Sequence, residues 1–241
     1  MGQSKILLII PAYNESESIL KVLDKVTNYQ KKSNYSLDYL VINDGSSDNE
    51  EEILLKHRIK HVELVQNLGI GGAVQTGYLY ALENNYDIAV QFDGDGQHDI
   101  ESLPNLVIPI LNGEVDFTVG SRFISDSTSK FKSSSARQIG IKILSVLIRW
   151  TSRINIHDVT SGYRAANLKV IKQFAKRYPS KYPEPESYMH LFANNIRVKE
   201  VGVNMHERVT GASSINLRKA IGYMVDVSLS ILIAAFIEKE K

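Results

Sequence analysis

The stretch KILLIIPAYNE, residues 5–15, decides the fold. It opens with an uninterrupted apolar run at residues 6–10, which is typical of a parallel strand buried on both faces. Pro11 ends the run. Asn14, with Glu17 three residues further on, predicts the N-cap of a helix that follows directly. The stretch therefore indicates the first strand, turn and helix of an α/β domain.

The alternation of strand and helix continues through the first half of the chain. Further strands are expected near residues 40–42, 62–65, 88–92 and 117–120. This order predicts a single Rossmann-like α/β domain with a mostly parallel central sheet and helices on both faces. Polar clusters follow three of the strands: Tyr13-Asn14-Glu15, Asp44 and Asp93-Gly94-Asp95. Because ligands bind beyond the carboxyl ends of such strands, we expect one site there.

The second half carries a basic block. Seven Lys or Arg residues and one acidic residue lie between Arg122 and Arg153, so this segment has charge +6 in a chain of net charge +1. Such a block favours one anionic partner, although a solvated basic face is the alternative. Residues 137–150 have the pattern of an amphipathic helix, and residues 125–135 and 178–185 are predicted loops.

The chain has no cysteine, no secretory signal pattern and no apolar stretch of about 18 residues, the length that spans a bilayer. The longest uncharged apolar run is residues 227–237. We expect a catalytic domain at residues 1–214, and at residues 215–241 a C-terminal amphipathic or apolar helix that docks on a membrane or a partner. These features favour a cytoplasmic protein, peripheral on the inner face of the cell membrane. No nucleic-acid partner is expected, and a homo-oligomer stays open.

The segment DGDGQHD, residues 93–99, carries the strongest chemical signal. Two carboxylates on a glycine-containing turn at a strand end can face one hard cation, which can neutralise a diphosphate leaving group. An EF-hand reading fails, because His98 and Pro104 stand where that loop requires Gly and Glu. An ordinary acidic turn is the alternative. The glycine-rich residues 67–72 could bring backbone N–H groups to a phosphate, but they lack the dinucleotide-binding pattern.

Several motifs together resemble family-2 inverting glycosyltransferases with the GT-A fold. They are PAYNE at 11–15, NDGSSD at 43–48, NLG at 67–69 and DGDGQHD at 93–99. Later motifs resemble the dolichol-phosphate mannose synthase branch and its bacterial polyprenyl-phosphate relatives. These are GSRF at 120–123, DVTSGYR at 158–164 and RVTGASS at 208–214. Ser214 stands where mannose synthases of this branch tend to carry lysine, which indicates a different acceptor or sugar.

The resemblance implies a role for each matching residue. The donor nucleotide would be bound by Pro11, Ala12, Tyr13, Glu15, Asp44, Gly69, Asp93 and Gly94. Mg²⁺ or Mn²⁺ would be bound, with the donor diphosphate, by Asp93, Asp95 and Gln97. The acceptor phosphate would be held by Arg122, Arg137, Arg208 and Ser213. The loop beside the sugar would be shaped by Asp158, Ser161 and Arg164. Asp95 and Arg122 would act in catalysis, joined by Glu186 as a base if the acceptor is a hydroxyl.

Structural roles compete with these. Asp44 could cap a helix at residues 46–48, Tyr13 could pack in the core, Asp158 could pair with Arg164, and the arginines could be surface charges. Three functions follow. The first is transfer of a hexose, from UDP-glucose or GDP-mannose, to a polyprenyl phosphate. The second is polysaccharide assembly on a sugar hydroxyl. The third is a nucleotide-sugar-binding subunit without activity. A membrane surface or a small membrane protein is the expected partner.

Overall fold

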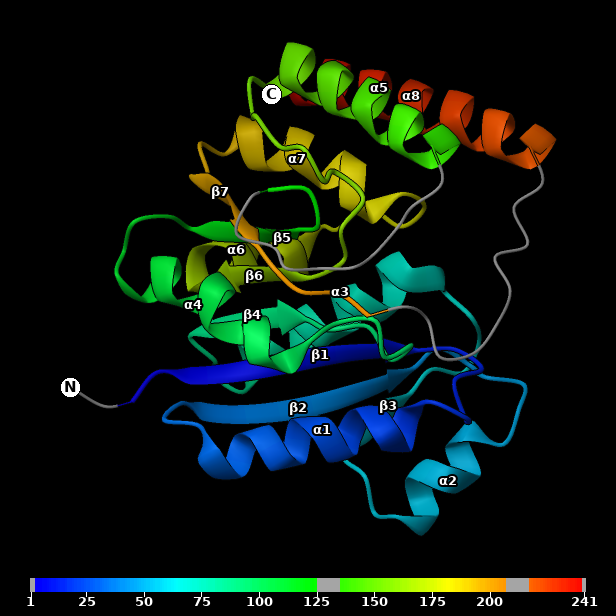
Figure 1. Cartoon of the computed structure of the whole chain (residues 1–241), viewed down its shortest axis with the longest axis vertical. Helices are drawn as coiled ribbons and strands as arrows, with labels where there is room; N and C mark the ends of the chain where they lie inside the picture. The colour runs from blue at the N-terminus through cyan, green and yellow to red at the C-terminus, as the bar shows by residue number, and fades with distance from the viewer. Residues whose placement is uncertain (1–2, 125–134, 207–216, 240–241) are drawn as a thin grey trace.

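A seven-stranded sheet lies at the centre of the described part of the protein, and helices cover both of its faces (Figure 1). The computed structural model describes residues 3–124, 135–206 and 217–239. The strands are β1 (Lys5–Ala12), β2 (Ser36–Asn43), β3 (His61–Glu63), β4 (Ile88–Gln91), β5 (Phe117–Ser121), β6 (Arg164–Asn167) and β7 (Val198–Gly202). The helices are α1 (Ile19–Lys32), α2 (Glu50–Lys56), α3 (Gly69–Glu83), the 3-10 turn η1 (Ile100–Ser102), α4 (Leu103–Leu111), α5 (Ser135–Ser152), α6 (Leu168–Lys176), α7 (Pro183–Ala193) and α8 (Leu217–Lys239).

The strand order is β3-β2-β1-β4-β6-β5-β7. Neighbouring strands run parallel except at β6, which is antiparallel to both β4 and β5. The predicted mostly parallel sheet is confirmed, and the strands expected in the first half are present. The sequence did not predict β6 or its place between β4 and β5.

Each face of the sheet has its own apolar core, and β1 contributes to both. Leu7 and Ile9 point into the core formed with α3, α5, α6, α7 and α8. Ile6, Leu8 and Ile10 point into the core formed with α1, α2 and α4. Every one of these five side chains is fully buried. The uninterrupted apolar run therefore exists because β1 is a central strand covered on both sides.

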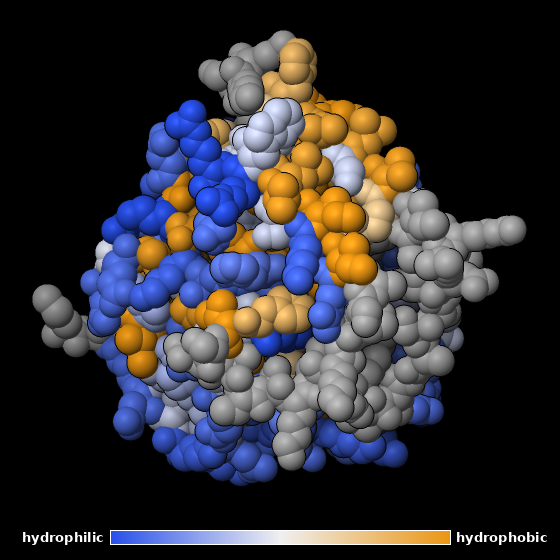
Figure 2. Space-filling model, turned by 45° about the horizontal axis from the view of Figure 1, so that its top comes forward, coloured by the Kyte–Doolittle hydropathy of each residue, from blue (hydrophilic) through white to orange (hydrophobic). Residues whose placement is uncertain are grey.

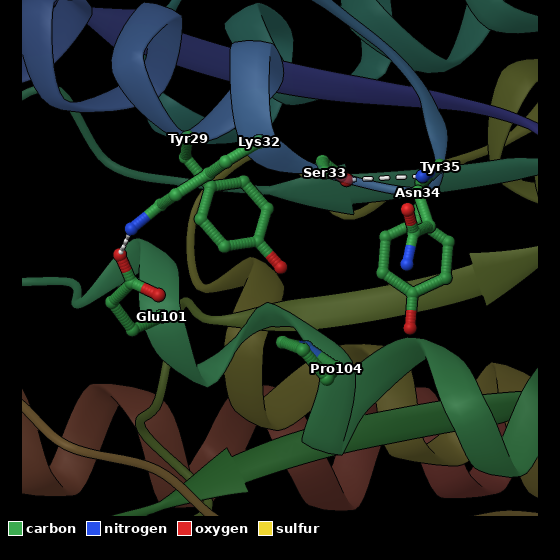
Figure 3. A pocket seen from close by; sticks show the side chains of 7 residues that line it. All are labelled: Tyr29, Lys32, Ser33, Asn34, Tyr35, Glu101 and Pro104. Atoms are coloured by element: carbon green, nitrogen blue, oxygen red, sulfur yellow. Dashed lines mark hydrogen bonds and ion pairs between the residues drawn. The ribbon is translucent and has the colours of Figure 1, made fainter.

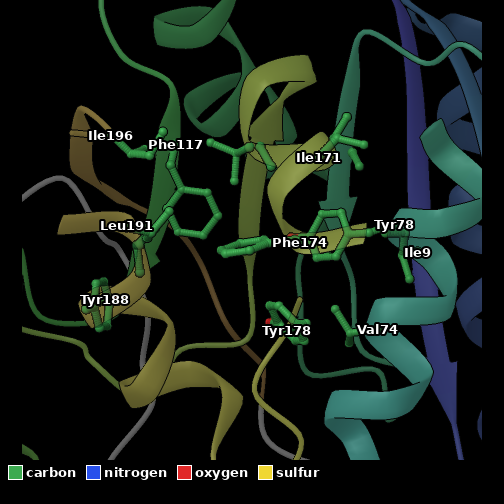
Figure 4. Close-up of a cluster of buried hydrophobic side chains, with 14 of the residues drawn as sticks. Ile9, Val74, Tyr78, Phe117, Ile171, Phe174, Tyr178, Tyr188, Leu191 and Ile196 are labelled. Atoms are coloured by element: carbon green, nitrogen blue, oxygen red, sulfur yellow. The ribbon is translucent and has the colours of Figure 1, made fainter. Parts of the chain in front are cut away.

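An aromatic cluster joins α3 and α6 to the sheet (Figure 4). The ring of Phe174 lies 5.2 Å from that of Tyr78, 4.8 Å from that of Tyr178 and 5.8 Å from that of Phe117, in edge-to-face arrangements. Such contacts add to the burial of large apolar rings. The cluster holds the half of the sheet that carries β5 and β6 against α3.

Helices α5 and α8 lie side by side as an outer layer on α7 (Figure 1). The amphipathic helix predicted at residues 137–150 is confirmed, and a helix occupies the apolar C-terminal segment. No helix among the described residues has the length and apolarity to cross a membrane. The division at residues 214 and 215 stays a prediction. The loop predicted at residues 178–185 is wrong in its last three positions, because α7 begins at Pro183, where proline suits a helix start.

A shallow hollow of about 350 Å³ lies between the end of α1 and the start of α4 (Figure 3). Its charged residues, Lys32 and Glu101, pair with each other at 2.5 Å. None of the polar side chains that follow the strand ends lines it. We therefore place the functional site elsewhere, at the carboxyl edge of the sheet.

Candidate active site

The polar clusters that follow three strands meet at one edge of the sheet, because β2, β1 and β4 are parallel neighbours. The Asp44 N–H donates to the Ala12 carbonyl at 2.9 Å, and the Gly94 N–H donates to the Pro11 carbonyl at 3.2 Å. The predicted nucleotide-side residues are therefore brought together by backbone hydrogen bonds across the strand ends. Tyr13 is 46% exposed beside them, so the alternative role in core packing is wrong.

Asn14 does not cap α1, which corrects the sequence prediction, because the helix begins at Ile19. Asn14 has a positive φ of 57°, and its side-chain oxygen accepts hydrogen bonds from the N–H groups of Ser47 and Asp48, at 2.8 and 3.2 Å. Asparagine tolerates this left-handed conformation better than most residues. Its amide is thus used to join the loop after β1 to the loop after β2.

Glu50 is a fully buried carboxylate behind these two loops, and sequence reasoning missed it. Its Oε2 accepts from the Glu15 N–H at 3.0 Å and from the Ser46 hydroxyl at 2.8 Å. Burial raises the pKa of the Glu50 carboxyl above its usual value, against the opposing effect of these hydrogen bonds. Glu50 therefore fixes the backbone of the nucleotide-side loop. Its place in a run of three glutamates gave no sequence signal.

Asp44 is almost completely buried and does not cap a helix at residues 46–48, since α2 begins at Glu50. Instead, its Oδ1 accepts from the Leu68 N–H at 2.7 Å. This bond ties the nucleotide side to the turn that starts α3 at Gly69, where φ is +77°. The alternative role of Asp44 as a cap is wrong, and Gly69 lies beside the predicted donor edge.

Asp93 and Asp95 lie on the turn after β4, as predicted. The Gln91 amide nitrogen donates to Asp93 Oδ1 at 3.1 Å, and the Gln97 N–H donates to Asp95 Oδ1 at 3.0 Å. A Cβ atom added at Gly162 would lie 2.7 Å from Asp93 Oδ2. Only glycine therefore lets the loop before β6 pass this close to the carboxylate.

The imidazole of His98 contacts both the backbone and the carboxylate of Asp93. Its Nδ1 accepts from the Asp93 N–H at 3.1 Å, and its Nε2 lies 3.6 Å from Asp93 Oδ2. The imidazole stacks on the Tyr163 ring with centroids 4.6 Å apart. Burial lowers the pKa of His98 to about 4, although the Asp95 charge opposes this. The ring is therefore neutral at pH 7 and carries its proton on Nε2, on the side of the Asp93 carboxylate.

The donor set suits a hard divalent cation that shares its ligands with a diphosphate. Mg²⁺ is commonly bound through one or two carboxylates together with substrate phosphates, and Mn²⁺ accepts the same oxygen ligands. Asp93 and Asp95 supply two carboxylates, and Gln97 is a half-buried neighbour. No group of three or more His, Cys, Asp or Glu side chains suited to a metal occurs among the described residues. Asp93 and Asp95 therefore fit a cation whose remaining ligands would include oxygens of the donor diphosphate.

Arg122 and Asp158 form a buried ion pair across the site. Arg122 Nε and Nη2 each lie 2.7 Å from one oxygen of Asp158, and the two side chains are 7% and 0% exposed. The Arg122 N–H and the Thr160 hydroxyl add further contacts. The predicted alternative pairing of Asp158 with Arg164 is wrong. Arg122 therefore is no ordinary surface charge, and Asp158 orients it beside the sugar-side loop.

Arg164 is completely buried and joins that loop to α7. Its guanidinium donates to the Ser161 carbonyl at 2.6 Å, to the Glu184 carbonyl at 3.0 Å and to the Ser187 hydroxyl at 2.9 Å. These bonds fix the loop that presents Gly162 to the carboxylate turn. The prediction that Arg164 shapes this loop agrees with its contacts, whereas its role beside a bound sugar stays a prediction.

Glu184, not Glu186, faces the carboxylate turn. The Gln91 side chain forms a hydrogen bond with the Glu184 carboxyl, and burial, reinforced by the charge of Asp93, raises the pKa of this group. The carboxyl of Glu186 instead forms a hydrogen bond with Ser230 of α8. The choice of Glu186 as candidate base is therefore corrected by the geometry. The two residues are two positions apart, on either side of Pro185, so the direction of each side chain depends on where α7 begins.

Three of the predicted acceptor residues cannot be placed. The side chain of Arg137 in α5, together with Arg208 and Ser213, lies outside the described residues. The same holds for the loop predicted at residues 125–135, apart from Ser135 at the start of α5. Their predicted roles stay predictions.

Solved structures of an enzyme share the fold of this chain. Glucosyl-3-phosphoglycerate synthase from Mycobacterium tuberculosis, solved in complex with Mn²⁺, uridine diphosphate and phosphoglyceric acid, matches with a TM-score of 0.71. The match covers 97% of this chain and 79% of that chain at 19% identity. At this identity the likeness shows the fold alone, which is GT-A.

The family follows from sequence comparison. Residues 7–174 match the profile of Glycosyl transferase family 2, and the chain belongs to this family. It is 30% identical to the UDP-N-acetylglucosamine–dolichyl-phosphate N-acetylglucosaminyltransferase of Methanococcus voltae, over 84% of this chain and 86% of that protein. It is 27% identical to the polyprenol monophosphomannose synthase of Mycolicibacterium smegmatis, over 89% and 83% respectively.

Proposed function

We propose that this protein transfers a hexose from a nucleotide sugar to a polyprenyl phosphate, with inversion at the anomeric carbon. The product is a lipid-linked monosaccharide for cell-envelope glycan synthesis. The names of the two relatives, both transferases to lipid phosphates, support this acceptor. The single structural observation that carries the proposal is that the loop from Asp158, which binds Arg122, brings Gly162 against the carboxylate of Asp93. The carboxylate turn suits a cation with a leaving diphosphate, and the loop brings Arg122 to the same site.

On the donor side, the exposed ring of Tyr13 offers a surface for the base, and the loops fixed by Glu50 and Asp44 hold the nucleoside. Asp93 and Asp95 would hold Mg²⁺ or Mn²⁺ with the diphosphate, and the cation would supply positive charge to the departing nucleoside diphosphate. We propose UDP-glucose as the first donor to test and GDP-mannose as the second. The uridine nucleotide in the name of the Methanococcus relative supports this order.

On the acceptor side, a phosphate oxygen attacks the anomeric carbon as the bond to the diphosphate breaks. An acceptor phosphate is already an anion at neutral pH, so this step needs no general base. The motif resemblance makes Arg122 a proposed ligand of that phosphate, and in this structure Asp158 binds its Nε and Nη2 atoms. Arg137, Arg208 and Ser213 are proposed as further ligands of that phosphate.

One observation supports a second candidate function, transfer to a sugar hydroxyl of a lipid-linked glycan. A hydroxyl acceptor requires a base, and Glu184 is a buried carboxyl beside the carboxylate turn whose pKa is raised. Because Gln91 bridges Glu184 and Asp93, a structural role for Glu184 is the simpler account. Replacement of Glu184 by glutamine separates the two functions.

A transfer assay tests the proposal. Purified protein is mixed with Mg²⁺ or Mn²⁺, a panel of radiolabelled nucleotide sugars, and membranes that contain undecaprenyl phosphate. We expect label in an organic-extractable lipid, and its loss with EDTA and in Asp95→Ala, by about 100-fold or more. Label in a glycan primer and none in lipid would instead support the second function, transfer to a sugar hydroxyl. No turnover with any donor, despite donor binding, would support a subunit without activity.

We also propose that the protein acts at the cytoplasmic face of the cell membrane, because a polyprenyl chain keeps the acceptor in the bilayer. We propose that its attachment is peripheral, either directly or through a small membrane protein.

A further inference from the structure

Helix α5 is apolar on two opposite sides. Its inner side buries Ile141, Leu144 and Ile148 in the core. Its outer side exposes Ile139, Ile143, Val146 and Trp150, with Trp150 76% exposed. At 3.6 residues per turn, these four positions fall within an arc of about 60°, directly opposite the buried ones. The outer stripe is therefore not needed for packing within the protein.

Helix α8 repeats this arrangement with the same spacing. Val227 and Ile231 are buried against the domain. Val225, Leu229, Leu232 and Phe236 are exposed, and they are separated by four, three and four residues, as are the four exposed positions of α5. Because α5 and α8 lie side by side on α7 (Figure 1), we treat the two outer stripes as one apolar surface, the α5–α8 face. Figure 2 shows apolar residues gathered in the upper half of the molecule, at the end that carries these helices.

The charges beside this face have one sign on α5. Lys142 and Arg149 are exposed on α5 itself, and Arg153 follows it. At 100° per residue, Lys142 and Arg149 flank the outer stripe on one side. The sequence of α5 contains no acidic residue. On α8, the exposed Asp226 already lies close to Lys181 and accepts from the Tyr182 hydroxyl. The face is thus apolar with a cationic border.

We propose that the α5–α8 face lies on the surface of a lipid bilayer that contains anionic headgroups. The inference rests on the proposed lipid acceptor and names the surface by which the enzyme reaches it. Two parallel stripes present their side chains to one plane, as a flat bilayer requires, and cations beside an apolar stripe are attracted to anionic headgroups.

The only tryptophan of the chain, Trp150, lies on this face and reports on it directly. The full chain is titrated with phosphatidylcholine vesicles that contain increasing fractions of phosphatidylglycerol, without donor or polyprenyl phosphate. We expect the Trp150 emission to shift to shorter wavelength and to be quenched by brominated lipids. The lipid concentration at which half of the protein is bound should rise about fivefold for each cation removed, as in Lys142→Gln. High salt should weaken binding in the same direction.

Two double variants test which surface of the protein binds the vesicles. Ile143→Gln with Val146→Gln should raise the lipid concentration for half-binding about tenfold or more. Leu55→Gln with Val65→Gln changes two exposed apolar residues, in α2 and after β3, outside the α5–α8 face, and should leave the lipid concentration for half-binding unchanged. Equal effects of the two pairs, or no change of Trp150 emission with any vesicle, would overturn the proposal. An emission shift that depends on protein concentration without vesicles, together with dimers in sedimentation, would overturn it in favour of self-association.

The proposed function is tested by a separate assay that does not depend on vesicle binding. Transfer to a short-chain polyprenyl phosphate in detergent needs no bilayer. If that transfer occurs while vesicles do not bind, the docking face is wrong and the function is supported. If vesicles bind through the face while no donor supports transfer, the docking face is supported and the function is wrong.

Discussion

Removal of the carboxylate of Asp158 should destabilise the protein strongly. Asp158→Ala leaves the guanidinium of Arg122 without the two 2.7 Å contacts that compensate its burial, in a site where Arg122 is 7% exposed. Removal of one partner from a buried ion pair costs about 3–5 kcal/mol. For a chain of this size, that loss corresponds to a fall in Tm of about 6–20 °C.

Urea unfolding followed by circular dichroism measures the effect. The variants are Asp158→Ala, Arg122→Met and the double variant, which together form a double-mutant cycle. The double variant should be less destabilised than the sum of the two single variants, because it removes the uncompensated charge with its partner. Glu101→Ala, in an exposed pair with Lys32, is the control and should change little. A loss below about 1 kcal/mol in Asp158→Ala would refute the claim that this pair is buried and unscreened.

Three further predictions concern single carboxylates. The hydrogen bonds from Arg197 lower the pKa of Asp116 from its usual 3.8 to about 2. The pair therefore stabilises the folded state at pH values above 3.8, and this stabilisation is lost as the pH falls from 3.8 through 2. Asp116→Asn should therefore lower the free energy of unfolding by about 2 kcal/mol at pH 7 and by little at pH 2. Urea unfolding at both pH values measures this, and equal losses at the two pH values would show that the effect does not come from the ionised carboxylate. Glu50→Ala removes the carboxylate oxygen that binds the Glu15 N–H and so positions the nucleotide-side loop. It should raise the KM for the donor about tenfold and leave kcat unchanged. A fall in kcat alone would argue against a positioning role. Glu184→Gln should lower transfer to polyprenyl phosphate by less than about tenfold, and a loss of about 100-fold or more, absent in Glu186→Gln, would identify Glu184 as a general base.

The sequence by itself determined the features that depend on neighbours along the chain. The apolar run at residues 6–10 and the strand and helix alternation predicted a mostly parallel sheet, since buried strands and amphipathic helices have different periods. The polar clusters at Asp44 and Asp93 each follow a strand, and parallel strands end at the same edge. Their convergence therefore needed only the order of elements. The motif resemblance then predicted the family correctly.

Only the tertiary structure decided which side chains meet across long separations. Asp158 pairs with Arg122, 36 positions away, because β6 is inserted antiparallel between β4 and β5 and carries its preceding loop to the end of β5. Whether Glu184 or Glu186 faces the carboxylate turn depended on the start of α7. The outer apolar stripes of α5 and α8 could be distinguished from core positions only when both sides of each helix were seen. A periodic pattern specifies a face, but it does not specify what that face contacts.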